Sequence, residues 1–180
     1  MKRLLASLCL TICVFALLTS ASAQQELNFA NLPLISSPQL MPNGYGELNW
    51  GNFFYVNPYS WANAGPGYKL GASRQDVAFI GGLFCRLDGN ACFGTLTVNN
   101  PLRFVLVSAD VAGGYGPAAV TATAYTNGKF IGQANYFVGT QMQKLLFPPS
   151  WGAVTEVDFQ VTGATGDLVI YDLSLYTLGG

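Results

Sequence analysis

The 180-residue sequence contains no histidine, and charged residues make up only 9% of it. Without histidine, the chain cannot form a Ser-His or Cys-His catalytic pair or a histidine-ligated zinc site. Of its eight Lys and Arg residues, Lys2 and Arg3 are adjacent at the start and the other six are scattered singly. They therefore form neither a basic stripe for nucleic acid nor a polybasic patch for a membrane surface. These absences exclude several common classes of enzyme and nucleic-acid-binding protein.

A sustained helical repeat is also missing, because no segment keeps an apolar period of about 3.6 residues. Turn signals recur about every 8 to 15 residues, as expected of an all-β chain. Residues 118–125 and 130–138 flank Thr126-Asn127-Gly128-Lys129, which predicts a hairpin with a two-residue Asn-Gly turn. Within 154–161 apolar and polar residues alternate, which predicts a sheet packed on one face and wet on the other.

These patterns predict an all-β fold, an antiparallel β-sandwich of roughly eight to ten strands with one hairpin disulfide. The predicted strands are residues 26–32, 48–56, 77–80, 93–98, 102–111, 118–125, 130–138, 141–147, 154–161 and 167–176.

The first segment predicts a secretory signal peptide. Lys2 and Arg3 precede an apolar run from Leu4 to Leu18, and Ser20-Ala21-Ser22-Ala23 supplies the small residues of a cleavage site. A membrane span is the alternative, but the run has about 15 residues against the roughly 20 that cross a bilayer, and no basic flank follows it. We expect cleavage after Ala23, a secreted protein with no membrane span in its mature form, and a single domain over residues 24–180.

Cysteine usage fits an exported protein. Cys9 and Cys13 leave with the signal peptide, so Cys85 and Cys92 remain as a pair in an oxidising compartment. Asp88-Gly89-Asn90 lies between them and favours a turn. The sequence predicts a disulfide that closes this hairpin loop, worth about 2.5 kcal/mol on the chain-entropy model. The alternative, a reactive cysteine, requires a nearby base or cation.

Several segments together resemble a known group of proteins: Asn28-Phe29-Ala30-Asn31-Leu32, residues 44–53 (GYGELNWGNF), Gly67-Tyr68 before Val77-Ala78-Phe79, residues 104–109 (FVLVSA) and residues 168–173 (LVIYDL). The group consists of secreted bacterial and fungal β-sandwich proteins with a galactose-binding-like jelly roll, similar to carbohydrate-binding modules. Many of its members have no known function, so the resemblance implies fold and secretion more than activity.

The resemblance also implies a structural calcium ion. In such jelly rolls an acidic residue near the first strand and an aspartate in the last strand often hold calcium, and Glu26 and Asp172 occupy those positions, with backbone carbonyls completing the shell. Ala30 and Asn31 stand where the group more often has an acid. The alternative for Asp172 is a strand residue that accepts hydrogen bonds from the backbone or from Tyr.

Aromatic and amide side chains concentrate between residues 43 and 72, among flexible glycines. Aromatic faces stack on sugar rings while amides bond hydroxyl groups, so this composition suits carbohydrate recognition. The candidate ligand-binding residues are Trp50, Asn52, Tyr55, Asn57, Tyr59, Trp61 and Tyr68. The strand context places Trp50 in the core, whereas the loop context predicts that Tyr59 and Trp61 are exposed.

The leading hypothesis is a secreted, non-catalytic module that binds carbohydrate or a cell-wall or matrix surface. A structural or interaction protein, or an effector without a small ligand, is the first alternative. The second is a polysaccharide-active enzyme. A glycosidase needs two carboxyl groups on either side of the scissile bond, and no spacing identifies such a pair. Glu156 and Asp158 fit a solvated strand face.

Overall fold

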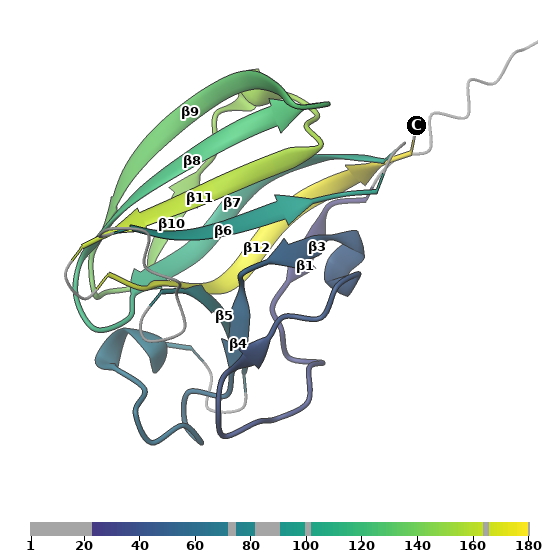
Figure 1. The fold of residues 1–180 in the computed structure, drawn as a ribbon. Helices are drawn as coiled ribbons and strands as arrows, with labels where there is room; N and C mark the ends of the chain where they lie inside the picture. Colours follow the sequence, from purple (N-terminus) through teal and green to yellow (C-terminus); the bar gives the residue numbers. More distant parts are fainter. Residues whose placement is uncertain (1–22, 72–74, 82–90, 100–101, 164–165, 180) are drawn as a thin grey trace, which may run out of the picture.

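Two antiparallel β-sheets face each other in the computed structural model, which describes residues 23–71, 75–81, 91–99, 102–163 and 166–179 (Figure 1). Sheet A contains, in spatial order, β10 (Gln143–Leu146), β7 (Arg103–Gly113), β12 (Leu168–Leu178), β5 (Val77–Ile80), β4 (Phe54–Val56) and β2 (Gln39–Leu40), and β1 (Gln25–Leu27) also pairs with β12. Sheet B contains β3 (Asn49–Gly51), β6 (Ala91–Thr97), β11 (Glu156–Thr162), β8 (Ala118–Thr126) and β9 (Lys129–Val138). The described residues also form the short 3₁₀ helices η1 (Tyr45–Glu47), η2 (Pro66–Tyr68) and η4 (Pro149–Trp151).

The main core lies between the two sheets and follows the predicted alternation. On β11 the side chains of Val157, Phe159 and Val161 are at most 1% exposed, while the residues between them are partly exposed. This confirms the prediction of a sheet that is dry on one face and wet on the other. It also confirms the all-β, two-sheet architecture.

The Asn-Gly hairpin is confirmed. Asn127 and Gly128 both have positive φ angles, 52° and 74°, and Thr126 pairs with Lys129 across the turn. Positive φ at both central residues is what a type I′ turn requires, and its twist matches that of the flanking strands.

The prediction of one strand over residues 48–56 is wrong. The chain forms β3 in sheet B, crosses the sandwich, and forms β4 in sheet A. The crossing occurs at Asn52, whose φ of 58° ends the extended conformation. Asparagine tolerates this left-handed region better than most residues. Phe53 follows in the core, with its ring 5.1 Å from that of Trp50 and 6.0 Å from that of Phe159.

The described residues contain twelve strands, more than the eight to ten predicted. The split of residues 48–56 adds one, and β2, which has only two residues, adds another. The first predicted strand is shorter than expected because Phe29, with a φ of 58°, turns the chain away after β1.

A second apolar cluster lies on the outer face of sheet A, beneath the segment that follows β4. Trp61 stacks on Phe79 with ring centres 6.0 Å apart, and Tyr68 meets both rings edge-on. We call this the outer aromatic cluster; its buried members are Val56, Trp61, Tyr68, Val77, Phe79, Ala112, Val169 and Tyr171. Residues 57–71 therefore form a cover over sheet A.

Two predictions fall on parts of the chain outside the described residues. Residues 1–22 of the predicted signal peptide lie outside the described residues, and Cys85 lies outside them as well. Cys92 is buried on β6, and its pairing with Cys85 stays a prediction. In the described part of the chain, no helix has the length and apolar character needed to cross a membrane.

Candidate functional site

The strand part of the predicted binding segment belongs to the core. Trp50 is 3% exposed and its indole N–H donates to the carbonyl of Tyr45 at 2.8 Å. Tyr55 is also buried in the main core. Asn52 is exposed at the crossing between the sheets. The expectation that Trp50 packs in the core is confirmed.

The loop part is also largely buried. The prediction that Trp61 is exposed is wrong, because it packs on Phe79 and Tyr68 in the outer aromatic cluster. Asn57 is buried and its side-chain oxygen accepts the backbone N–H groups of Tyr59 and Ser60, each at 3.1 Å. Such an Asn side chain closes a turn on its own backbone.

Tyr59 is exposed, as predicted. Its ring is 45% exposed, and its hydroxyl lies 2.9 Å and 2.8 Å from the carbonyl oxygens of Lys69 and Gly71. Of the seven predicted ligand-binding residues, only Tyr59 and Asn52 are exposed to solvent. Their role in binding stays a prediction, and the seven do not share one exposed surface.

The outer face of sheet B brings together more exposed polar and aromatic side chains than the seven predicted ligand-binding residues do. β11 is the middle strand of this sheet, and β6 and β8 flank it. Strand register places the outward side chains in rows, one of which runs Thr95, Asp158, Thr123 and Gln133. The next row on one side is Phe93, Gln160, Thr121 and Asn135, and on the other side it is Thr97, Glu156, Tyr125 and Phe130. We call these three rows the sheet B face.

Cross-strand hydrogen bonds hold the polar side chains of this face. The Thr95 hydroxyl donates to Oδ1 of Asp158 at 2.9 Å, and the Thr121 hydroxyl donates to Oδ1 of Asn135 at the same distance. Within β9, the Gln133 amide also donates to Oδ1 of Asn135, at 3.4 Å. Side chains held in this way lose less conformational freedom when a ligand binds.

Two carboxyl groups stand at the centre of the sheet B face. Partial burial raises the pKa of Glu156, and the negative charge and hydrogen bonding of Asp158 raise it further. Within the five strands of sheet B, which are described in full, Lys129 is the only basic residue, and it lies at the start of the edge strand. The centre of the face therefore offers mainly hydrogen-bond acceptors.

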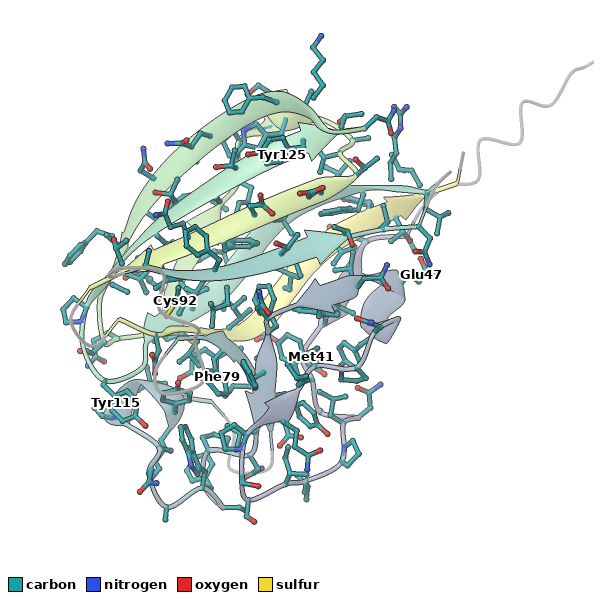
Figure 2. All side chains as sticks on the ribbon, in the orientation of Figure 1. Met41, Glu47, Phe79, Cys92, Tyr115 and Tyr125 are labelled. Atoms are coloured by element: carbon teal, nitrogen blue, oxygen red, sulfur yellow. The ribbon has the colours of Figure 1, made fainter. Side chains whose placement is uncertain are left out.

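Aromatic rings lie at two separate places on the face. Phe93 on β6 is 43% exposed, and Phe130 on β9 is 57% exposed. Phe130 meets Tyr125 edge-on at 6.3 Å. Figure 2 shows Tyr125 on β8, far from Phe79 of the outer aromatic cluster. These rings are not among the predicted ligand-binding residues, although Cys92, Gly94 and Leu96 alternate with Phe93 along β6 and thereby indicate that Phe93 points outward.

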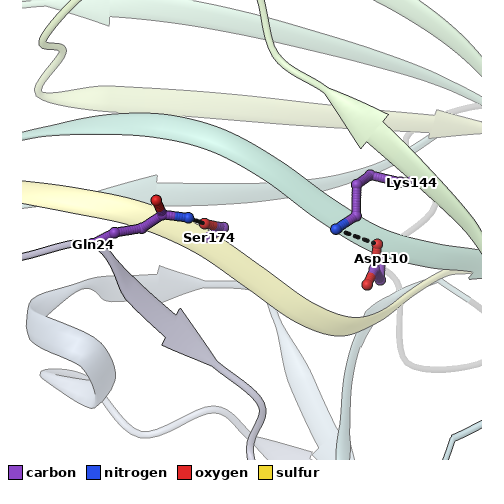
Figure 3. Close-up of polar contacts among 4 residues, drawn as sticks. All are labelled: Gln24, Asp110, Lys144 and Ser174. Atoms are coloured by element: carbon purple, nitrogen blue, oxygen red, sulfur yellow. Dashed lines mark hydrogen bonds and ion pairs between the residues drawn. The ribbon is translucent and has the colours of Figure 1, made fainter.

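The residues assigned to calcium lie on sheet A. Glu26 pairs with Ser174 and Asp172 with Asp110, and Lys144 forms a 3.5 Å ion pair with Asp110 (Figure 3). Burial raises the pKa of Asp172, and the charges of Glu26 and Asp110 add to the effect, while Lys144 opposes it.

The geometry gives this cluster no clear metal site. In the described ranges, no group of three or more His, Cys, Asp or Glu side chains is placed to hold a metal ion. Ser174, the cross-strand partner of Glu26, accepts a hydrogen bond from the Gln24 side chain. Calcium at Glu26 and Asp172 stays a prediction.

Comparison with known proteins supports the fold. The crystal structure of a DUF4465 family protein from Bacteroides caccae superposes with a TM-score of 0.61 at 15% identity, covering 86% of this chain and 99% of that one. This likeness agrees with the β-sandwich that the sequence resemblance implied. The carbohydrate-binding module TmCBM61, solved with β-1,4-galactotriose, matches at 14% identity over 80% of this chain and all of its own, with a TM-score of 0.35, too low to support an argument. No protein-family model matches the chain, and no curated protein is detectably similar in sequence.

Proposed function

We propose that the protein is a secreted, non-catalytic module that binds carbohydrate through the sheet B face. The observation that carries the proposal is the placement of exposed aromatic rings beside fixed carboxyl, amide and hydroxyl groups on one face of one sheet. Aromatic rings stack on the apolar faces of sugars, and carboxylate and amide oxygens accept hydrogen bonds from sugar hydroxyls.

The carboxyl pair on this face suits binding better than glycoside hydrolysis. Glycosidases separate their two carboxyl groups by about 5 Å or more, so that the glycosidic bond fits between them. Glu156 and Asp158 are close enough for hydrogen bonding between them to raise the pKa of Glu156. Asp158 is also bonded to Thr95. A carboxylate already engaged by Thr95 suits a fixed hydrogen-bond acceptor on a binding face.

The proposal includes three predictions that remain to be tested. They are secretion after cleavage at Ala23, jelly-roll connectivity of the sandwich, and the disulfide between Cys85 and Cys92. Secretion would place the binding module outside the cell. The oxidising environment there keeps disulfides such as Cys85–Cys92 formed.

Retention of the secreted protein on insoluble polysaccharides tests the proposed function. The wild type should be retained by at least one polysaccharide, and the double variant Tyr125→Ala/Phe130→Ala should be retained much less. Leu146→Ala is the control, because Leu146 is 68% exposed on β10 of the other sheet. Retention by no polysaccharide, or equal loss in the control, would contradict the proposal.

A further inference from the structure

We infer that the ligand of the sheet B face is an extended, uncharged polysaccharide chain several sugar units long, an inference that rests on the proposed function. It depends on the distance between the aromatic positions and on the charge of the groups between them.

Strand register fixes the distance. Phe93 lies opposite Gln160, and Gln160 lies opposite Thr121, so Phe93 and Thr121 are two strands apart. Tyr125 is four residues further along β8. With about 4.8 Å between strands and about 3.4 Å per residue, Phe93 and Tyr125 are roughly 17 Å apart along a diagonal of the sheet. One sugar ring cannot contact both positions, but an extended chain can.

The side chains along this diagonal are suited to hydroxyl groups. Asp158 and Gln160 on β11 lie between the two aromatic positions, with Thr121 and Thr123 beside them. Their carboxylate and amide oxygens accept hydrogen bonds from sugar hydroxyls, and the threonine hydroxyls both donate and accept. A chain lying across the face would meet such a group at each step between the rings.

Charge selects against acidic polymers. Glu156 and Asp158 occupy the centre of the face, and within the five described strands of sheet B the only cation is Lys129, at one edge. Like charges brought together across an interface oppose binding. A polysaccharide rich in uronic acids or sulfate would place its negative charges against these two carboxyl groups.

A length series tests the inference. Affinities are measured by titration calorimetry for neutral oligosaccharides from a monosaccharide to an octasaccharide, prepared from a neutral polysaccharide that retains the protein. Affinity should rise with length until a chain spans both aromatic positions. Phe93→Ala should weaken binding of the longest chains about two- to tenfold and leave that of the shortest unchanged or nearly so, whereas Leu146→Ala should change neither.

A charge series completes the test. Pectin and alginate, both rich in uronic acid, should not retain the protein under conditions in which the neutral polymer does. Full affinity for a mono- or disaccharide, indifference of long chains to Phe93→Ala, or stronger retention by the acidic polymers would overturn the inference while the proposed function stands. If no polysaccharide of any kind retains the protein, the proposed function fails and the inference fails with it.

Discussion

The hydroxyl of Tyr68 donates a 2.6 Å hydrogen bond to Oδ2 of Asp167, and both residues are buried. The bond connects η2 to the residue just before β12, which is 99 positions away in the sequence. Tyr171 strengthens the same connection by donating its hydroxyl to the carbonyl of Gly67. Residues 57–71 are thereby fixed on sheet A, which explains why the rings of Trp61 and Tyr68 pack inward.

Loss of this bond should destabilise the fold. Burial and the neighbouring charge of Asp167 raise the pKa of Tyr68 far above its usual value, so the phenol stays a donor at any ordinary pH. We expect Tyr68→Phe to lower the free energy of unfolding by about 1–3 kcal/mol, because a buried carboxylate oxygen loses its donor. Urea denaturation measures this. Tyr115→Phe, which removes a more exposed hydroxyl bonded to the Asn63 carbonyl, should cost about 1 kcal/mol or less; an equal loss in both variants would contradict this account.

Asp76 should make stability depend on pH. It is 1% exposed, and in the described part of the chain its carboxylate has at most a weak hydrogen bond from the Asn57 side chain. Burial raises its pKa from 3.8 to about 6, although the nearby Asn57 side chain lowers it somewhat. Below pH 3.8 the folded and unfolded states both hold the proton. Between about pH 4 and 6 only the folded state does, so stability falls by up to about 3 kcal/mol as the pH rises.

Denaturation curves across this pH range test the role of Asp76. Asp76→Asn should remove much of the fall and raise stability at pH 7, because no buried charge then forms. Glu47→Gln, at an exposed carboxyl, should leave the profile unchanged. If Asp76→Asn keeps the full pH dependence, the buried carboxyl is not its source.

Trp61 should matter for stability. Because its ring packs against Phe79 and Tyr68, we expect Trp61→Ala to lower the free energy of unfolding by about 3–5 kcal/mol. Leu34→Ala, at a side chain that is 63% exposed, should change it by no more than about 0.5 kcal/mol. A Trp61→Ala protein as stable as the wild type would show that residues 57–71 do not cover sheet A.

Gly67 should be intolerant of any side chain. Its N–H donates to the carbonyl of Gly114 at 2.9 Å, and an added Cβ would overlap the carbonyl oxygen of Gly113 on β7. We expect Gly67→Ala to lower the melting temperature markedly, since only backbone movement can relieve the overlap. At Gly139 the nearest atom to an added Cβ is the Gln143 side-chain oxygen at 3.8 Å, so Gly139→Ala should be tolerated. Similar melting temperatures for the two variants would contradict the close approach of η2 to β7.

The sequence predicts most of the fold because local signals and burial agree in the second half of the chain. The sequence predicts every strand from β7 to β12. Asn127 and Gly128 identify the turn between β8 and β9 without any tertiary information. In the first half, the reversal at Asn52 and the shortened first strand at Phe29 depend on single positive φ angles. Phe29 itself and Phe53, the residue after Asn52, are buried in the core, and a local sequence pattern does not reveal this packing.

The candidate site was harder to predict for a physical reason. An aromatic residue in a Gly- and Asn-rich loop resembles a ligand contact, but Trp61 and Tyr68 have a second apolar surface to cover on the outer face of sheet A. Phe93 and Phe130 resemble core residues because they occur within strands. Only the register between strands shows that they share a face with Asp158 and Gln160.

The most direct test of the account maps where a sugar binds. Backbone amide chemical shifts of the labelled protein would be followed by NMR during titration with a neutral oligosaccharide from a polysaccharide that retains it. We expect the largest changes on β6, β11 and β8, centred on Thr95, Asp158 and Thr123. Changes concentrated around Tyr59 and residues 57–71, or no change at any amide, would contradict it.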